Sequence, residues 1–202
     1  PLFDHLAGSV PSEDQVAAIR EQVGGRPVAL FPGSRRQEVR GTMPVLLAAC
    51  AQIQRQVPEV RFASVCPESV QPLVRDFLDE ASIEVCFPDV PPHVLACASD
   101  LCITKSGTIT LEIASQLTPM VIFYRVSPLV YFLASGLAQT PYVGIVNNLA
   151  GRMICPEKVM YRPEPEWVAQ RALELLTDDT CRRRSQREVE RAIRPLARPG
   201  AS

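Results

Sequence analysis

The chain has 202 residues, of which 47% are hydrophobic and 21% are charged, and its formal net charge is −1. A chain of this size and composition forms one large domain or two small ones around a substantial core. The near-neutral charge provides no overall field toward nucleic acid, which argues against a nucleic-acid-binding protein. The seven cysteines are scattered without a Cys-x-x-Cys pair. We interpret them as reduced core residues of a cytosolic protein rather than disulfides or zinc ligands.

The predicted elements alternate between helices and strands. Apolar residues at helical spacing predict helices over residues 11–23, 42–56, 68–80, 92–98, 108–117, 127–136, 164–176 and 181–194. Short apolar runs predict strands over residues 27–31, 60–65, 83–87, 101–104, 120–124 and 142–146. This alternation is typical of an open parallel sheet, Rossmann-like, with helices on both faces. We therefore predict an α/β fold, and one domain over residues 1–202.

One charged segment and one apolar run are candidates for contact with a membrane. Residues 181–198 contain seven arginines and two glutamates, a net charge of +5. We interpret this segment as a helix with a solvated face, because no matching run of large apolar residues accompanies the charge. The longest candidate for a membrane-spanning run, residues 129–134, is far shorter than the ~20 residues that a spanning helix needs.

Residues 100–125 are expected to form a strand, a tight turn, a helix and a second strand. A helix that begins directly after a strand leaves its first N–H groups unpaired, and together with the helix dipole they attract anions. Small residues at Ser106-Gly107 let a phosphate approach closely. Glu112 lies one helical turn beyond Thr108, and its carboxylate can accept two hydrogen bonds from a ribose diol. The alternative, that Ser106 caps the helix and Glu112 is a solvated acid, stays open on these residues alone.

A second turn of small residues, Gly33-Ser34-Arg35, follows the first predicted strand. Open parallel sheets bind ligands at the carboxyl ends of their strands, so we expect both turns to lie over one cleft. The forked guanidinium of Arg35 suits a phosphate, the alternative being an exposed surface arginine. Neither a Gly-x-Gly-x-x-Gly nor a P-loop sequence is present, so a nucleotide would be held in another way. We predict no cofactor and no metal site, because no acidic cluster suited to Mg²⁺ is evident.

Four segments that occur in this order resemble the lipid-A-disaccharide synthase family, glycosyltransferases with a two-domain GT-B architecture. They are residues 31–39 (FPGSRRQEV), 106–112 (SGTITLE), 119–129 (PMVIFYRVSPL) and 147–152 (NNLAGR). The likeness covers most of the chain and is specific in combination. It implies the carboxyl-terminal, donor-binding domain of such an enzyme, ending before the family's last helix.

The resemblance implies transfer of 2,3-diacylglucosamine from its UDP derivative onto 2,3-diacylglucosamine 1-phosphate, with inversion and release of UDP. It implies that the turns Gly33–Arg35 and Ser106–Thr108 hold the diphosphate and that Glu112 holds the ribose. Lys105 either adds a positive charge near the phosphates or points into water.

The same resemblance assigns Asn147 tentatively to the reacting centre. The chain departs from the family at Val146 and Asn148, where proline and leucine are usual, so either asparagine is a candidate. The general base is expected in the amino-terminal domain of the family.

The implied partners are a UDP-sugar donor, an acylated glucosamine phosphate acceptor and the protein's own amino-terminal domain, with no nucleic acid. The implied location is cytoplasmic, with peripheral contact to the cytoplasmic face of the inner membrane as an option. We expect the isolated fragment to bind UDP weakly and to turn over nothing. The alternatives are another GT-B UDP-sugar transferase, a UDP-sugar 2-epimerase, or a non-catalytic domain that binds anionic lipid or a partner through residues 181–198.

Overall fold

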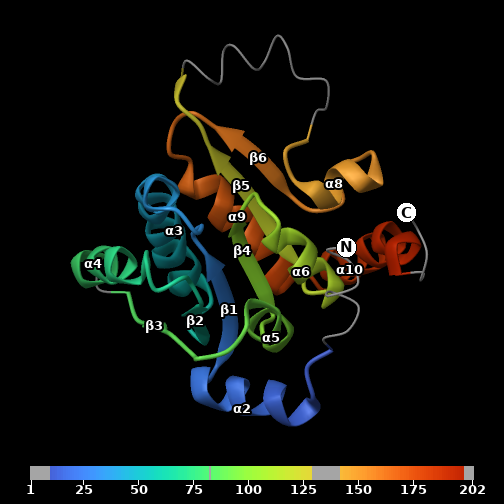
Figure 1. Ribbon diagram of the computed structural model, residues 1–202, viewed down its shortest axis with the longest axis horizontal. Coiled ribbons are helices and arrows are strands. Elements are labelled where there is room, and N and C mark those ends of the chain that lie inside the picture. Colours follow the sequence, from blue (N-terminus) through green and yellow to red (C-terminus); the bar gives the residue numbers. More distant parts are fainter. Residues whose placement is uncertain (1–9, 82, 129–141, 198–202) are drawn as a thin grey trace.

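A six-stranded parallel sheet forms the centre of the computed structural model, which describes residues 10–81, 83–128 and 142–197 (Figure 1). The strands are β1 (Arg26–Phe31), β2 (Val60–Ser64), β3 (Val85–Cys86), β4 (Leu101–Lys105), β5 (Met120–Arg125) and β6 (Glu157–Met160). Their order across the sheet is β3-β2-β1-β4-β5-β6, so the direction of winding reverses between β1 and β4. This is the order of a doubly wound, Rossmann-like sheet, and it confirms the predicted fold class.

Helices cover both faces of the sheet. They are α2 (Glu13–Val23), α3 (Arg36–Gln56), α4 (Gln71–Ala81), α5 (Pro92–Ala98), α6 (Ile109–Ser115), α8 (Ile145–Ala150), α9 (Pro165–Thr177) and α10 (Asp179–Ile193), followed by the 3-10 turn η1 (Arg194–Ala197). Successive side chains of a strand point to opposite faces. Val28 and Leu30 of β1 therefore pack into the core beneath α3, α4 and α9. Ala29 and Phe31 pack into the core that includes residues of α2, α5, α6, α8 and α10.

The predicted strand over residues 142–146 is wrong. Its last two residues begin α8, and the sixth strand is β6, which the sequence analysis missed. Within residues 10–81, 83–128 and 142–197, β6 pairs only with β5, at the edge of the sheet, and its two central residues are half-buried. An edge strand of this kind, with the sequence Glu-Lys-Val-Met, lacks the continuous apolar run that identifies a buried parallel strand. The predicted helix over residues 127–136 lies mostly outside the described residues.

Helix α3 begins at Arg36, six residues before its predicted start. Pro44 therefore lies inside the helix, where a proline has no N–H to donate and is unfavourable. Burial of Val39 and Met43 in the core outweighs that cost. The hydroxyl of Thr42 also donates to the carbonyl of Pro32 at 2.6 Å. Helix α3 is therefore anchored to the turn after β1 and starts directly from it.

The remaining predicted segments are confirmed as helices, and their ends differ from the predicted ones by a few residues. The basic segment forms most of α10, which Asp178 caps by accepting hydrogen bonds from the N–H groups of Thr180 and Cys181. All seven cysteines are free thiols. Among the described residues, no helix has the length and apolar character needed to cross a membrane. No three His, Cys, Asp or Glu side chains gather there in a metal-binding group.

Candidate functional site

The two predicted turns meet where the winding of the sheet reverses. β1 and β4 are adjacent and parallel, with Phe31 in register with Thr104, so both strands end at the same edge. A cavity of about 210 Å³ lies between the turns that follow them. Its lining combines residues of the two turns (Gly33, Ser34, Ser106, Gly107 and Thr108), the charged Glu38 and Lys105, and the apolar Phe31, Val65, Pro67, Pro92 and Ile109. The reversal point thus has the shape and position of a ligand site.

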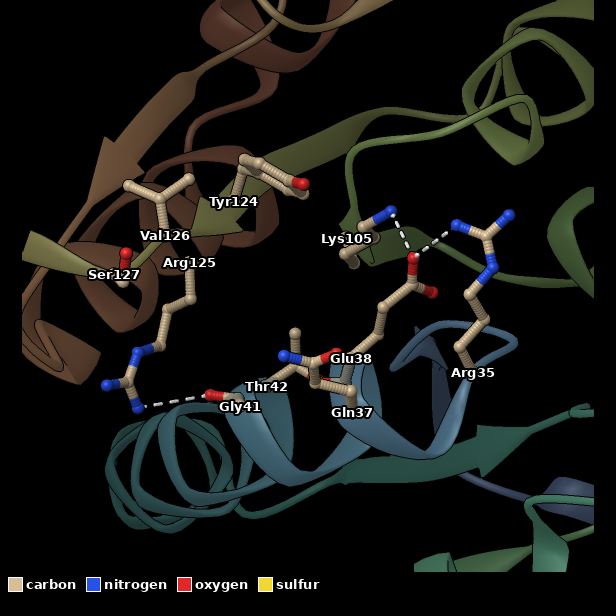
Figure 2. Close-up of a pocket in the computed structure, with 10 residues that line it drawn as sticks. All are labelled: Arg35, Gln37, Glu38, Gly41, Thr42, Lys105, Tyr124, Arg125, Val126 and Ser127. Carbon is tan, nitrogen blue, oxygen red and sulfur yellow. Dashed lines mark hydrogen bonds and ion pairs between the residues drawn. The ribbon is translucent and has the colours of Figure 1, made fainter. Parts of the chain in front are cut away.

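A second cavity of about 360 Å³ adjoins the first and is lined by Arg35, Tyr124 and Arg125 among others (Figure 2). Glu38 and Lys105 line both cavities. They therefore form the wall that the two cavities share. Arg35, which was predicted in the same cleft as Ser106, lines the adjoining cavity.

The shared wall is an ion pair between α3 and the end of β4. Lys105 Nζ donates to Glu38 Oε1 at 3.0 Å, and Arg35 Nη1 lies 3.7 Å from the same oxygen. Figure 2 shows both cations pointing to this carboxylate. The Lys105 side chain is only 16% exposed, whereas that of Arg35 is 83% exposed. Lys105 therefore does not simply point into water, and the exposed side chain of Arg35 lies at the rim of the site.

Glu38 was not identified from the sequence. Its Oε2 accepts a hydrogen bond from the N–H of Ser34 at 3.1 Å, so the carboxylate folds back over the turn that precedes its own helix. Gly33 makes room for it: the φ angle of Gly33 is +116°, and a Cβ atom there would lie 2.8 Å from Glu38 Oε2. The available signal was a glutamate at the third position of a helix, where side chains reach back to the preceding N–H groups.

The surroundings of Glu38 favour its charged form. Burial raises the pKa of this carboxyl, but the hydrogen bond and charge of Lys105 and the N–H groups of Ser34 and Arg35 outweigh burial, so the pKa lies below its usual 4.5. A lowered folded-state pKa adds stability above the unfolded pKa, and this stability is lost as the pH falls through the folded pKa.

We therefore expect Glu38→Gln to reduce the free energy of unfolding at pH 7 more than at acidic pH. The difference between the two proteins should shrink as the pH is lowered through and below 4.5, because wild-type Glu38 then also becomes neutral. Urea unfolding at a series of pH values measures this. A difference that is the same at every pH would contradict it.

The second turn does not use Ser106 as a helix cap. Ser106 is buried, and its hydroxyl donates to the carbonyl of Val143 at 3.2 Å. Thr108 is the N-cap residue of α6 and makes no side-chain capping bond. The first backbone bond of this turn runs from Thr110 N to Gly107 O. The Ser106 side chain therefore ties the turn to the segment before α8.

Glu112 lies on α6, half-buried, and is not among the described residues that line the two cavities. Burial raises the pKa of its carboxyl, and the charge of His93 on α5 partly offsets this. Its assignment to a ribose stays a prediction.

Asn147 is fully buried and holds α8 against β6. Its side-chain N–H groups donate to Cys155 O at 2.9 Å and to Glu157 Oε2 at 2.6 Å, and its Oδ1 accepts from the N–H groups of Ile154 and Cys155. The two donors and two acceptor positions of the amide are thus all used within the protein. Asn148 is exposed and donates to Tyr142 O.

Glu157, also missed in the sequence, is the partner of Asn147. Its Oε1 accepts from the N–H groups of Val143 and Gly144 at 2.5 and 2.7 Å, and the residue is only 8% exposed. A Cβ atom on Gly144 would lie 2.8 Å from Glu157 Oε2. The carbonyl of Val143 accepts a hydrogen bond from the hydroxyl of Ser106, so this buried carboxylate is linked through Val143 to the second turn of the site.

The chain matches known proteins over nearly its whole length. Residues 4–202 match the family model described as Lipid-A-disaccharide synthetase. A Lipid-A-disaccharide synthase of Gloeothece citriformis is 29% identical over 207 residues, covering 99% of this chain and 53% of that protein. The chain spans about half the length of the curated relatives it matches.

Solved structures share the fold at low sequence identity. The C-terminal domain of the glycosyl transferase group 1 family protein LpcC from Francisella tularensis has a TM-score of 0.62 and 11% identity, covering 96% of this chain and 97% of that one. Anabaena HepE in complex with UDP-glucose has a TM-score of 0.61 and 15% identity. The match covers 93% of this chain and 48% of that one. These likenesses show the fold, that of one half of a GT-B glycosyltransferase. The match to the family model over residues 4–202 shows that this chain belongs to the lipid-A-disaccharide synthetase family.

Proposed function

We propose that this chain binds the UDP-sugar donor of a lipid-A-disaccharide synthase. The reaction is transfer of 2,3-diacylglucosamine from its UDP derivative to 2,3-diacylglucosamine 1-phosphate, with release of UDP. The observation that carries the proposal is the meeting of the two turns after β1 and β4 beside Lys105 and Arg35. Membership of the family supports this activity over a 2-epimerase or a non-catalytic lipid-binding domain.

The proposed chemistry depends on stabilising the departing UDP. Negative charge accumulates on the diphosphate as the bond to the sugar breaks, and fixed donors and cations lower the energy of that state. Lys105 and Arg35 supply the cations in this proposal, and the Gly33–Ser34 and Ser106–Thr108 turns supply close backbone approach. The apolar part of the smaller cavity, with Phe31, Val65 and Ile109, gives a planar base a surface to pack on.

The other assignments belong to the same proposal. Glu112 binds the ribose. The assignment of Asn147 to the reacting centre stays a prediction, and because its amide is bonded within the protein we assign it a positioning role through Glu157. The base that takes the acceptor's proton is expected from the amino-terminal domain. The acylated acceptor and a place at the cytoplasmic face of the inner membrane follow from family membership and stay predictions.

Calorimetric titration with UDP tests the proposal. We expect wild-type protein to bind UDP, and Arg35→Ala to weaken binding by about 1.5–3 kcal/mol, the range for hydrogen bonds to charged groups. Arg55→Ala is the matched control, because Arg55 lies in the last turn of the same helix, about 30 Å from Arg35. An unchanged dissociation constant in Arg35→Ala would remove Arg35 from the site. Absence of UDP binding by the wild-type protein would contradict the proposal as a whole.

A further inference from the structure

The candidate diphosphate site already holds an anion, the carboxylate of Glu38. One oxygen accepts from Lys105 and lies 3.7 Å from the Arg35 guanidinium, and the other accepts from the N–H of Ser34. Lys105 comes from the end of β4, Ser34 and Arg35 come from the turn between β1 and α3, and all three converge on one carboxylate. They are the same donors that the proposed function assigns to the diphosphate.

We propose that Glu38 is an internal competitor of the diphosphate, occupying its cations and turn N–H until a ligand displaces it. This inference rests on the proposed function. Two anions cannot share the wall between the cavities without repulsion, so binding requires the carboxylate to give up Lys105 and Arg35. The cations then pass to the phosphate oxygens. Competition of this kind weakens binding of the donor and of the UDP product alike.

Helix capping by itself does not account for the arrangement. A glutamate in the first turn of a helix often reaches back to the preceding N–H groups, and Glu38 does so toward Ser34. A cap, however, requires only an acceptor oxygen. The bond to Lys105 joins residues 67 positions apart, on α3 and β4, and both partners line both cavities. The two roles therefore differ in one respect: competition requires the negative charge.

Glu38→Gln separates the roles, because glutamine keeps an acceptor oxygen for Ser34 and removes the charge. We expect this variant to bind UDP, and inorganic pyrophosphate, about fivefold or more tightly than wild type, as repulsion between charges about 4 Å apart is removed. Calorimetry at fixed ionic strength measures both ligands, and thermal unfolding checks the fold. Glu38→Met is a second neutral variant of similar length and should shift affinity in the same direction. Glu174→Gln removes a more exposed ion pair, to Arg171 on α9, whose residues line neither of the two cavities, and should leave affinity unchanged.

The outcomes distinguish this inference from the proposed function. Tighter binding in the neutral Glu38 variants, with the Glu174 control unchanged, supports it. If wild type binds UDP and Glu38→Gln binds equally or more weakly, Glu38 instead orients Lys105 and Arg35, and the inference is overturned while the proposed function stands. If neither protein binds UDP or pyrophosphate, both are overturned.

Discussion

Replacement of Glu157 by alanine is expected to lower the free energy of unfolding by about 3–5 kcal/mol, because three hydrogen bonds to a charged group are lost, each contributing about 1.5–3 kcal/mol at most. The carboxylate accepts from the N–H groups of Val143 and Gly144 and from the side chain of Asn147. Gly144 would lose its partner in a buried site, Val143 in a partly buried one, and Asn147 would keep only Cys155 O as an acceptor. Urea unfolding at pH 7 measures the loss. Because Ser106 is bound to Val143, amide exchange in the Ser106 turn should also accelerate.

Two variants control for this result. Glu157→Gln keeps an acceptor for one pair of N–H groups but places a second amide donor toward Asn147, so its loss should be intermediate. Glu59→Ala removes an exposed carboxylate that lies 3.8 Å from Arg26, and should cost only about 0–1 kcal/mol. A loss below about 1 kcal/mol in Glu157→Ala would show that water replaces the carboxylate.

Gly33→Ala is expected to destabilise the protein by about 2–4 kcal/mol and to abolish measurable UDP binding. Part of the cost is backbone strain at a φ of +116°, a region unfavourable for residues with a Cβ. The rest is crowding, because the added methyl would lie 2.9 Å from the Cβ of Glu38, where α3 cannot move without disturbing the core. Thermal unfolding and UDP titration measure the two effects.

Gly107→Ala is the matched control for stability. It lies in the other turn of the site, and an added Cβ would meet nothing closer than Lys105 Nζ at 4.0 Å. Its free energy of unfolding should change by only about 0.5 kcal/mol. If both variants lose the same free energy of unfolding, the backbone conformation of Gly33 is not the cause of the loss.

The segment from β4 through α6 to β5 shows what local pattern is able to predict. Its strands are buried on both faces and appear as continuous apolar runs, and its helix is bounded by a small-residue turn and a proline. Each signal lies within a few residues of the element it predicts. The alternation of such units implies a parallel sheet, and a parallel sheet brings the ends of β1 and β4 to one edge. The meeting of the two turns was therefore predictable before any contact was known.

The edge of the sheet shows where that reasoning fails. β6 is stabilised by its single neighbour β5 and by the half-buried position of its central residues, neither of which appears in a four-residue sequence. The apolar residues before α8 have the composition of a strand. They form no strand, because the N–H groups of Val143 and Gly144 donate to Glu157 of β6, and the chain enters α8 at Ile145.

The amino-acid sequence by itself determined the fold class, the positions of the two turns and the resemblance to the lipid-A-disaccharide synthase family, because these depend on periodicity and short motifs. Only the tertiary structure decided which partners the polar side chains bind. It placed Lys105 on Glu38 across 67 residues of chain and turned Asn147 inward to Glu157. The physical reason is that a polar side chain takes the partner that packing brings near it, and a buried one must take it, whereas local sequence specifies only which groups are available.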